Sequence, residues 1–290
     1  MSETWHKFVT VQDDLKVFYR ESGPADRPIV LLLHGFPSSS FQYRNFIPLL
    51  AKNYYVLAPD MPGFGLTVYP DSYQFTFAAL AETMEAFLAK LSIDHCAVYI
   101  FDYGAPVAFR MALNGRVHWD AIITQNGNAY DEGFGEAHWA PVFQYWKTGS
   151  PEDREAVREK VLTLEATKNQ HVAGVPAEEI ELIAPESYVY DFALMQRPGN
   201  SDIQLDLFYD YRTNKDLYPS FQQYLRDSAV PVLAAWGKGD PSFVPAGAEA
   251  YRRDSPTAEI HLLDTGHFAL ETKLCEITAL VLLFLSKKLS

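Results

Sequence analysis

Three polar side chains of this sequence could act together as a nucleophile, an acid and a base. Asp102 lies in the string YIFDYGAP, Asp240 in WGKGDP and His267 in DTGHF. Each follows an apolar run typical of a buried strand, and ligands of open α/β sheets bind beyond the carboxyl ends of the strands. A carboxylate can displace a leaving group from a saturated carbon to form an ester, which a histidine held by a second carboxylate can hydrolyse with water. The three residues therefore predict hydrolysis through a covalent ester.

Asp102 has the local sequence of a nucleophile on a sharp strand-to-helix turn. Gly104 and Ala105 follow it before a helix, so the strand and the helix can approach closely. The amide of Tyr103 lies at the N-terminus of that helix, where an anion is stabilised. A second turn, with the sequence HGFP, ends an earlier strand and directs the amide of Phe36 toward the same edge of the sheet. We expect these two amides to form an oxyanion hole; the alternative is that Asp102 only caps the helix.

His267 is the one histidine of the eight whose position predicts catalysis. It comes directly after the last predicted strand, 27 residues beyond Asp240, which also ends a strand. The other histidines are predicted to be ordinary core or surface residues. No Gly-x-Ser-x-Gly occurs in the sequence, so a serine nucleophile is excluded.

The elements that must position these residues are short strands alternating with helices. The strands are predicted at 8–11, 15–19, 29–33, 54–58, 97–101, 121–124, 230–235 and 259–263, and the helices at 42–51, 76–91, 105–113, 247–251 and 268–288. This alternation is typical of a mostly parallel sheet covered by helices on both faces. The predicted fold class is therefore α/β, with a mostly parallel eight-stranded sheet and flanking helices.

The alternation stops at about residue 131. Residues 131–227 contain aromatic, acidic and helix-forming residues without a convincing strand, and Ser150 followed by proline and two acids begins a helix. Pro176 and Pro185 begin others. We predict that residues 1–130 and 228–290 form a core domain and that 131–227 form a helical cap, inserted after the sixth strand over the carboxyl ends of the strands.

The composition restricts the partners and the location. With 37 acidic and 24 basic residues the formal charge is −13, which repels nucleic acid and anionic membranes. The longest apolar stretch, 277–285, is too short to span a bilayer and is predicted as a helix packed on the sheet. The N-terminus does not resemble a signal peptide, and Cys96 and Cys275 are predicted as two buried free thiols, so we expect a cytoplasmic protein. The sequence does not determine the oligomeric state.

Five strings together resemble a known family. HGFP, DMPGFG, DYGAP, GKGD and GHF are similar to motifs of the α/β-hydrolase superfamily, within it the branch of epoxide hydrolases and haloalkane dehalogenases. The resemblance covers residues from about 7 to 128 and from 229 to 286. It implies that Asp102 attacks carbon, that His267, oriented by Asp240, activates water, and that the Phe36 and Tyr103 amides hold the oxyanion. It also implies that no metal or organic cofactor takes part.

Residues of the predicted cap indicate which leaving group the substrate carries. Epoxide hydrolases use tyrosines of the cap to donate a proton to the epoxide oxygen, and the resemblance implies the same role for cap tyrosines in this sequence. The string LFYDYRTN is similar to the segment that carries one of them, which places that role at Tyr211. The position of the second tyrosine falls on Val142, so Tyr145 or His138 could replace it, or the second acid is missing.

Haloalkane dehalogenases hold the halide with a tryptophan directly after the nucleophile and with a second nitrogen donor. Tyr103 and Phe36 stand at those places, which disfavours a halide, although Trp139 and Trp146 offer nearby cap indoles. A haloacid substrate would need arginines where Tyr103 and Pro106 stand. We therefore predict hydrolysis of a small hydrophobic or aryl epoxide to a diol. The alternatives are a dehalogenase and, more remotely, a non-catalytic ligand-binding protein on the same fold.

Overall fold

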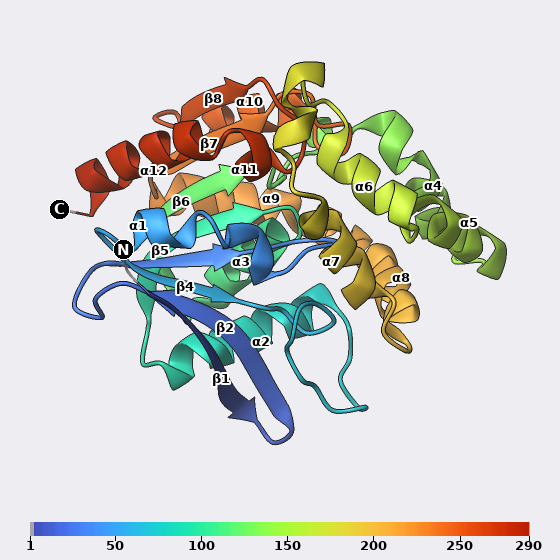
Figure 1. Cartoon of the computed structure of the whole chain (residues 1–290), viewed down its shortest axis with the longest axis horizontal. Helices are drawn as coiled ribbons and strands as arrows, with labels where there is room; N and C mark the ends of the chain where they lie inside the picture. The colour runs from blue at the N-terminus through green and yellow to red at the C-terminus, as the bar shows by residue number, and fades with distance from the viewer. Residues whose placement is uncertain (1–2, 290) are drawn as a thin grey trace.

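The computed structural model describes residues 3–289, whose strands form one eight-stranded sheet (Figure 1). The spatial order is β1-β2-β4-β3-β5-β6-β7-β8. Strand β2 pairs antiparallel with β1 and β4, and the other neighbouring pairs are parallel. The strands are β1 (Thr4–Gln12), β2 (Leu15–Ser22), β3 (Ile29–Leu33), β4 (Tyr55–Pro59), β5 (His95–Phe101), β6 (His118–Gln125), β7 (Val232–Gly237) and β8 (Glu259–Leu263). The predicted fold class is confirmed, with strand ends shifted by a few residues.

Helices cover both faces of the sheet, and therefore its central strands are buried on both sides. Along β3, Leu31 and Leu33 join one core while Val30 and Leu32 join the other, because successive side chains of a strand point to opposite faces. Full burial of a side chain of this size stabilises the fold by about 1.5–3 kcal/mol. The first face is covered by α2 (Phe77–Lys90), α3 (Gly104–Asn114), α9 (Arg212–Ser228) and α10 (Pro245–Asp254), and the second by α1 (Ile47–Leu50), α11 (Ala269–Thr272) and α12 (Leu274–Lys288).

The chain between β6 and β7 forms helices and no strand. Its elements are η2 (Asp131–Gly133), α4 (Glu136–Thr148), α5 (Pro151–Val161), α6 (Leu164–Val172), η3 (Ala177–Leu182), α7 (Pro185–Met195), α8 (Asn200–Asp210) and α9. Helix α5 begins as predicted: the Ser150 hydroxyl accepts a hydrogen bond from the Asp153 amide at 3.1 Å, and Pro151 is the first helical residue. Helices α4–α8, here called the cap, lie beyond the carboxyl ends of the strands (Figure 1), whereas α9 packs on α3. The division into two domains at 131 and 227 stays a prediction.

Several predicted features are wrong in detail. The helix predicted at 268–288 is divided at Lys273, whose φ of −116° and ψ of 27° are not helical, into α11 and α12. The helix predicted at 42–51 is a 3₁₀ turn, η1 (Ser40–Tyr43), followed by α1, which starts anew with Pro48 in its first turn. Cys96 is buried, but Cys275 is exposed because it lies in the first turn of α12, on the side away from the sheet.

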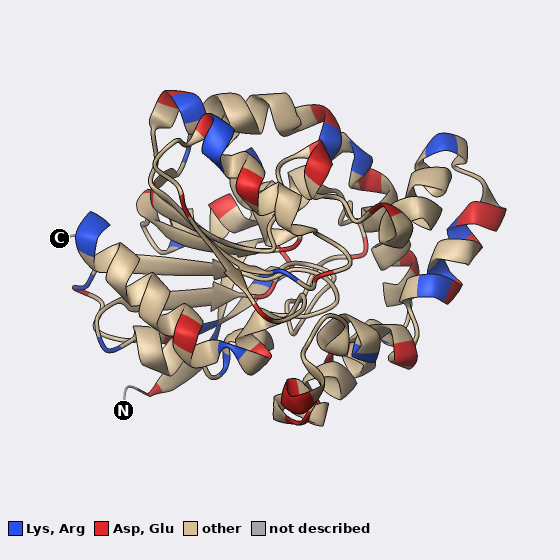
Figure 2. Ribbon diagram, turned by 90° about the horizontal axis from the view of Figure 1, so that it is seen from above, with Lys and Arg blue, Asp and Glu red and all other residues tan. Residues whose placement is uncertain are grey.

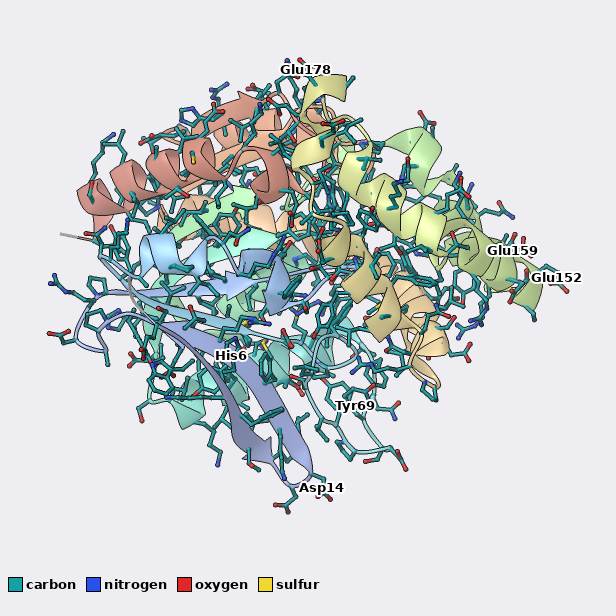
Figure 3. All side chains as sticks on the ribbon, in the orientation of Figure 1. His6, Asp14, Tyr69, Glu152, Glu159 and Glu178 are labelled. Atoms are coloured by element: carbon teal, nitrogen blue, oxygen red, sulfur yellow. The ribbon has the colours of Figure 1, made fainter. Side chains whose placement is uncertain are left out.

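Charged residues of both signs lie along the outer helices, and the strands carry few of them (Figure 2). The acidic residues Glu152, Glu159 and Glu178 lie at the periphery of the helices between β6 and β7 (Figure 3). Within residues 3–289, none of the helices is long and apolar enough to cross a membrane. The apolar stretch 277–285 packs on the sheet as part of α12, as predicted.

Candidate active site

Asp102 forms the tip of the turn between β5 and α3. Its φ of 48° lies in the left-handed region, which residues other than glycine seldom adopt. A Cβ atom at Gly35 would lie 2.2 Å from Asp102 Oδ1, and one at Gly104 would lie 2.3 Å from the Leu33 carbonyl oxygen. Glycine at position 35 therefore allows the HGFP turn to pack against Asp102, and glycine at position 104 allows the start of α3 to pack against the end of β3. A strained backbone held by such packing is the geometry of a nucleophile elbow.

Two backbone amides converge on the Asp102 carboxylate. The Phe36 amide donates to Oδ1 at 2.6 Å, and the Tyr103 amide also donates to the carboxylate. Oδ2 is the oxygen nearest His267, at 3.9 Å from Nε2. The two oxygens thus differ: Oδ1 is held by an amide and Oδ2 faces the imidazole.

His267 and Asp240 form a buried pair in the loops that follow β8 and β7. Nδ1 of His267 is 2.6 Å from Oδ2 of Asp240, and both side chains are buried. The other ring nitrogen, Nε2, is therefore directed at Asp102. Its distance of 3.9 Å is too long for a direct hydrogen bond and leaves His267 able to act on a molecule bound between the two groups.

Three further residues support this pair, and the sequence analysis did not single them out. The Asn126 amide group donates to Oδ2 of Asp240 and the Ser242 backbone amide donates to Oδ1, each at 2.7 Å. The Gln125 side chain donates to the His267 carbonyl oxygen at 3.0 Å. Asn126 directly follows β6, so a search for polar residues at strand ends would also have found it. The backbone contact of Ser242 leaves no signal in the sequence.

The environment changes the pKa values of the two groups that face each other. Burial raises the pKa of Asp102 to about 6, although the charge of His267 and the Phe36 and Tyr103 amides oppose this effect. Burial by itself would lower the pKa of His267, but the charge and the hydrogen bond of Asp240, with the charge of Asp102, outweigh it and raise that pKa above its usual value. Near neutral pH, Asp102 is therefore ionised and can act as a nucleophile.

A small cavity lies over Asp102. Its free volume is about 20 Å³, a little more than one water molecule needs. The wall is largely aromatic, and only a small reacting group fits beside the carboxylate. The lining residues are Phe36, Asp102, Tyr103, His138, Trp139, Val161, Gln170, Phe208, Ser242 and His267.

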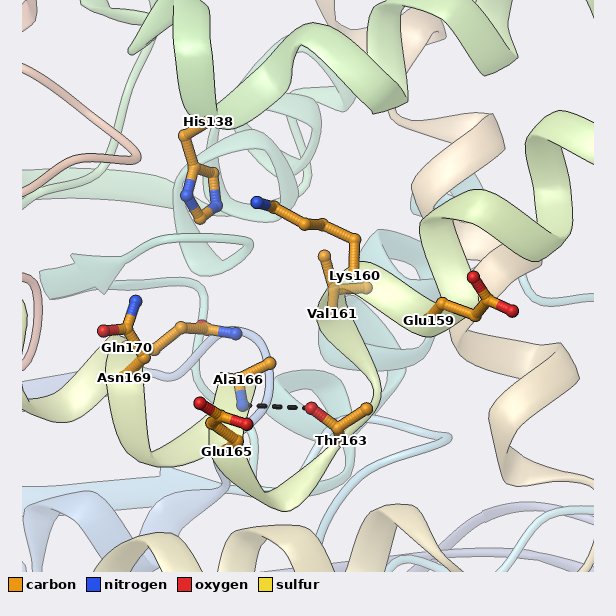
Figure 4. Close-up of a pocket in the computed structure, with 9 residues that line it drawn as sticks. All are labelled: His138, Glu159, Lys160, Val161, Thr163, Glu165, Ala166, Asn169 and Gln170. Atoms are coloured by element: carbon orange, nitrogen blue, oxygen red, sulfur yellow. Dashed lines mark hydrogen bonds between the residues drawn. The ribbon is translucent and has the colours of Figure 1, made fainter.

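A larger basin adjoins this cavity on the side of the cap (Figure 4). Its free volume is about 350 Å³, and most of its side chains are polar or charged. The basin and the cavity share His138, Val161 and Gln170 in their walls. The remaining lining residues are Glu159, Lys160, Thr163, Glu165, Ala166 and Asn169, from α5, α6 and the turn between them.

Comparison with known proteins identifies the fold family. The family model of the α/β-hydrolase fold matches residues 28–274, which is most of the chain. The chain belongs to the α/β-hydrolase fold family. A protein of Saccharomyces cerevisiae described as an uncharacterized hydrolase, YNR064C, is 50% identical to this α/β hydrolase over 276 residues, covering 94% of each chain.

Two further likenesses are more distant. A haloalkane dehalogenase of Mycobacterium marinum is 36% identical over 118 residues, 39% of each chain. The solved structure of the epoxide hydrolase CorEH superposes with a TM-score of 0.75, at 19% identity, over 98% of this chain and 99% of that one. At that identity, the structural likeness shows the fold alone.

Tyr211 and Tyr145, which the sequence suggests as proton donors in this hydrolase, do not line the cavity. The hydroxyl of Tyr211 is 3.3 Å from that of Tyr218, and its ring lies 5.6 Å from the ring of Tyr103. Tyr145 accepts a hydrogen bond from Arg154 at 3.1 Å and packs on Tyr209. Tyr211 therefore packs against Tyr103 without being part of the cavity wall, and Tyr145 packs within the cap.

The cap indoles are already engaged. Trp139 lines the cavity, but its indole N–H donates to the Ser242 carbonyl oxygen at 2.9 Å. The indole N–H of Trp146 donates to the Phe208 carbonyl oxygen at 2.7 Å. His138 lines both the cavity and the basin, with Nε2 3.2 Å from the Ser242 hydroxyl.

Tyr103 is the phenol that lines the cavity. Its side chain is buried, and its hydroxyl has no hydrogen-bond partner among residues 3–289. Burial raises its pKa well above the usual value, and the charge of Asp102 adds to this effect. The hydroxyl therefore keeps its proton at neutral pH and can donate it in a hydrogen bond.

We find no group of His, Cys, Asp and Glu side chains that could hold a metal ion within the described part of the chain. The polar groups around the Asp102 carboxylate are an imidazole paired with a second carboxylate and two backbone amide donors. The catalytic roles of the individual residues stay predictions.

Proposed function

We propose that this α/β hydrolase opens an epoxide to a vicinal diol through an ester of Asp102. The observation that carries the proposal is Tyr103, which follows the nucleophile, lines the cavity and has a buried hydroxyl without a hydrogen-bond partner among the described residues. A buried hydroxyl without a partner is costly, and a substrate oxygen that accepts its hydrogen bond removes that cost. An epoxide oxygen is such an acceptor.

In the first step, Oδ2 of Asp102 attacks an epoxide carbon and the carbon–oxygen bond of the ring breaks. The oxygen that leaves takes a proton from Tyr103, and the product is an ester whose carbonyl oxygen is Oδ1. The contact between Oδ1 and the Phe36 amide, at 2.6 Å, supports this assignment of the two oxygens. The amide is already in place for the charge that develops on Oδ1 in the next step.

In the second step, His267 takes a proton from a water molecule and the resulting hydroxide attacks the carboxyl carbon of Asp102. The Phe36 and Tyr103 amides stabilise the tetrahedral oxyanion, and Asp240 stabilises the imidazolium. When the intermediate collapses, the diol alkoxide leaves and takes the proton from His267. Asp102 is then a carboxylic acid that carries the water-derived hydroxyl, and its proton returns through solvent to the Tyr103 phenolate. Asp102 is restored as a carboxylate.

A haloalkane substrate is the second candidate, favoured by the partial likeness to a haloalkane dehalogenase. A halide that leaves needs N–H donors in the cavity. The Trp139 and Trp146 indoles donate to backbone carbonyl oxygens, so neither is free for a halide. This observation supports the epoxide over the halide.

We expect Tyr103→Phe to lower kcat/KM for a small epoxide by roughly a hundredfold, because only the proton donor is removed. Tyr211→Phe should have a smaller effect, since Tyr211 does not line the cavity. Tyr145→Phe also deletes one buried phenolic hydroxyl and serves as the matched control, with activity close to that of the wild type. Steady-state kinetics with ethyloxirane would decide; an unchanged kcat/KM in Tyr103→Phe would reject Tyr103 as the donor.

The pH dependence of kcat/KM should report the ionisation of Asp102. Burial raises the pKa of this carboxyl to about 6, and only the carboxylate attacks carbon. We therefore expect kcat/KM to be lost as the pH falls through about 6, about tenfold for each further pH unit. An ordinary aspartate would place this loss near pH 3.9. Initial rates measured between about pH 4.5 and 8 distinguish the two, and a flat profile down to pH 5 would contradict the raised pKa.

A further inference from the structure

The cavity over Asp102 is too small for most of a substrate. Its free volume of about 20 Å³ contrasts with the 350 Å³ of the adjoining basin, and only the basin has the size of an ordinary ligand pocket. The two spaces meet at His138, Val161 and Gln170. A substrate that places its reacting group at Asp102 must therefore extend any larger substituent past these residues into the basin.

The side chains of the basin offer hydrogen-bond donors. In Figure 4, the Lys160 ammonium group is directed toward the His138 ring, and Asn169 and Gln170 lie across the basin from it. The Thr163 hydroxyl is engaged, since it accepts a hydrogen bond from the Ala166 amide at 3.1 Å. The side-chain amides of Asn169 and Gln170 form no hydrogen bonds with other described residues. Lys160 and the two amides are thus available to a ligand.

Charge in the basin opposes an ionic substituent of either sign. Glu159 and Glu165 line it together with Lys160, and the whole chain carries a formal charge of −13. The carboxylates and the net charge repel an anion, while the ammonium group repels a cation. Burial lowers the pKa of His138, and the charges of His267 and Lys160 act in the same direction against that of Asp240, so this ring adds no charge. A neutral substituent with oxygen acceptors fits the basin best.

We infer that the substrate is a small terminal epoxide with a neutral, oxygen-rich substituent, such as an ether or a hydroxylated chain. The inference rests on the proposed epoxide hydrolysis and adds the substrate class. The ring lies in the aromatic cavity at Asp102 and the substituent lies among Lys160, Asn169 and Gln170. This class differs from the hydrophobic or aryl epoxide expected from the aromatic residues of the cap, because those rings surround only the small inner cavity.

Three terminal epoxides test the substrate class. The first carries a methoxyethoxymethyl group, the second a hexyl group and the third a phenyl group, and these substituents have equal numbers of non-hydrogen atoms. We expect the wild type to hydrolyse the diether with a kcat/KM roughly tenfold or more above that of hexyloxirane and phenyloxirane. A hydrogen bond between neutral groups contributes up to about a factor of ten and one from the Lys160 ammonium group contributes more, so a ratio of about tenfold or more is expected.

A double variant tests the residues. Lys160→Met combined with Gln170→Leu keeps similar side-chain length and removes both donors, so the preference for the diether over hexyloxirane should fall about tenfold or reverse. Lys147→Met removes a cation from the end of α4, outside the basin, and is the matched control whose preference should stay that of the wild type. The measured quantity is the ratio of kcat/KM for the diether to kcat/KM for hexyloxirane in the same variant. A lower fraction of folded protein changes both values equally and therefore does not change this ratio.

The outcomes separate the inference from the proposed function. The substrate class is overturned if the three epoxides are hydrolysed equally well, or if the double variant leaves the preference unchanged. Hydrolysis of ethyloxirane in the same experiment would still support the proposed function. No hydrolysis of ethyloxirane or of any of the three, and no covalent adduct on the protein, overturns both. A preference for the diether that the double variant abolishes and the control retains supports the inference.

Discussion

His267→Gln should react once with an epoxide and then stop, so that the ester accumulates on Asp102. Asp102 and Tyr103, which perform the first step in the proposed mechanism, are unchanged, whereas the base for the second step is lost. Removal of a general base costs about 10²–10⁴-fold in rate. Intact-mass spectrometry after incubation with ethyloxirane should therefore show protein heavier by one whole epoxide, together with turnover lowered by roughly a thousandfold.

The mass also identifies the leaving group. An epoxide adds all its atoms, whereas an alkyl bromide would add its alkyl group without the bromine. His118→Gln replaces an exposed histidine at the start of β6 and is the matched control, with normal turnover and no adduct. Asp102→Asn combined with His267→Gln should also remain unmodified. An adduct on this double variant would place the nucleophile elsewhere, and no adduct on His267→Gln with either reagent would refute the ester mechanism.

Asp102→Asn should abolish activity and stabilise the protein. Asparagine tolerates the φ of 48° at this position and keeps an oxygen for the Phe36 amide, but it cannot form the ester as a carboxylate does. We expect turnover to fall by roughly a thousandfold or more. Intact mass at the end of the assay should confirm that the asparagine is still an amide.

The gain in stability follows from the raised pKa. Folding raises the pKa of Asp102 from 3.8 to about 6, so the folded state holds its proton more tightly than the unfolded state. As the pH rises from about 3.8 through 6, the wild type therefore loses stability, up to about 3 kcal/mol, and asparagine has no such loss.

Urea unfolding at two pH values checks this sign. Asp102→Asn should exceed the wild type in free energy of unfolding by about 3 kcal/mol at pH 8 and by about half as much at pH 5. Asp264→Asn, at an exposed aspartate in the loop before His267, is the matched control and should show no pH-dependent gain of this size. A gain that does not depend on pH, or a loss, would contradict the unfavourable burial of the Asp102 charge.

Much of the sheet and of the candidate site could be predicted from the sequence. The strands of this fold end in short strings with glycine and a polar residue, and parallel strands bring their carboxyl ends to one edge of the sheet. Asp102, Asp240 and His267 are therefore close together once the order of strands is known. The same rule would have found Asn126, which supports Asp240.

The cap could be predicted only as a set of helices. Its periodic patterns and prolines indicate where α5 and α7 begin, since these signals are local. The partners of its side chains are not local. Trp139 and Trp146 offer free donors in the sequence, yet each N–H meets a backbone carbonyl oxygen from a segment far along the chain.

The sequence by itself determined the α/β fold, the strand-ending positions of the nucleophile, acid and histidine, and the absence of a serine elbow, because each depends on a few neighbouring residues. Only the tertiary structure decided which tyrosine lines the cavity: Tyr103 does, whereas Tyr211 packs against it and does not. It also decided that the inner cavity is small and that a polar basin adjoins it. The physical reason is that cavities and free donors are what remains after distant segments have packed and paired.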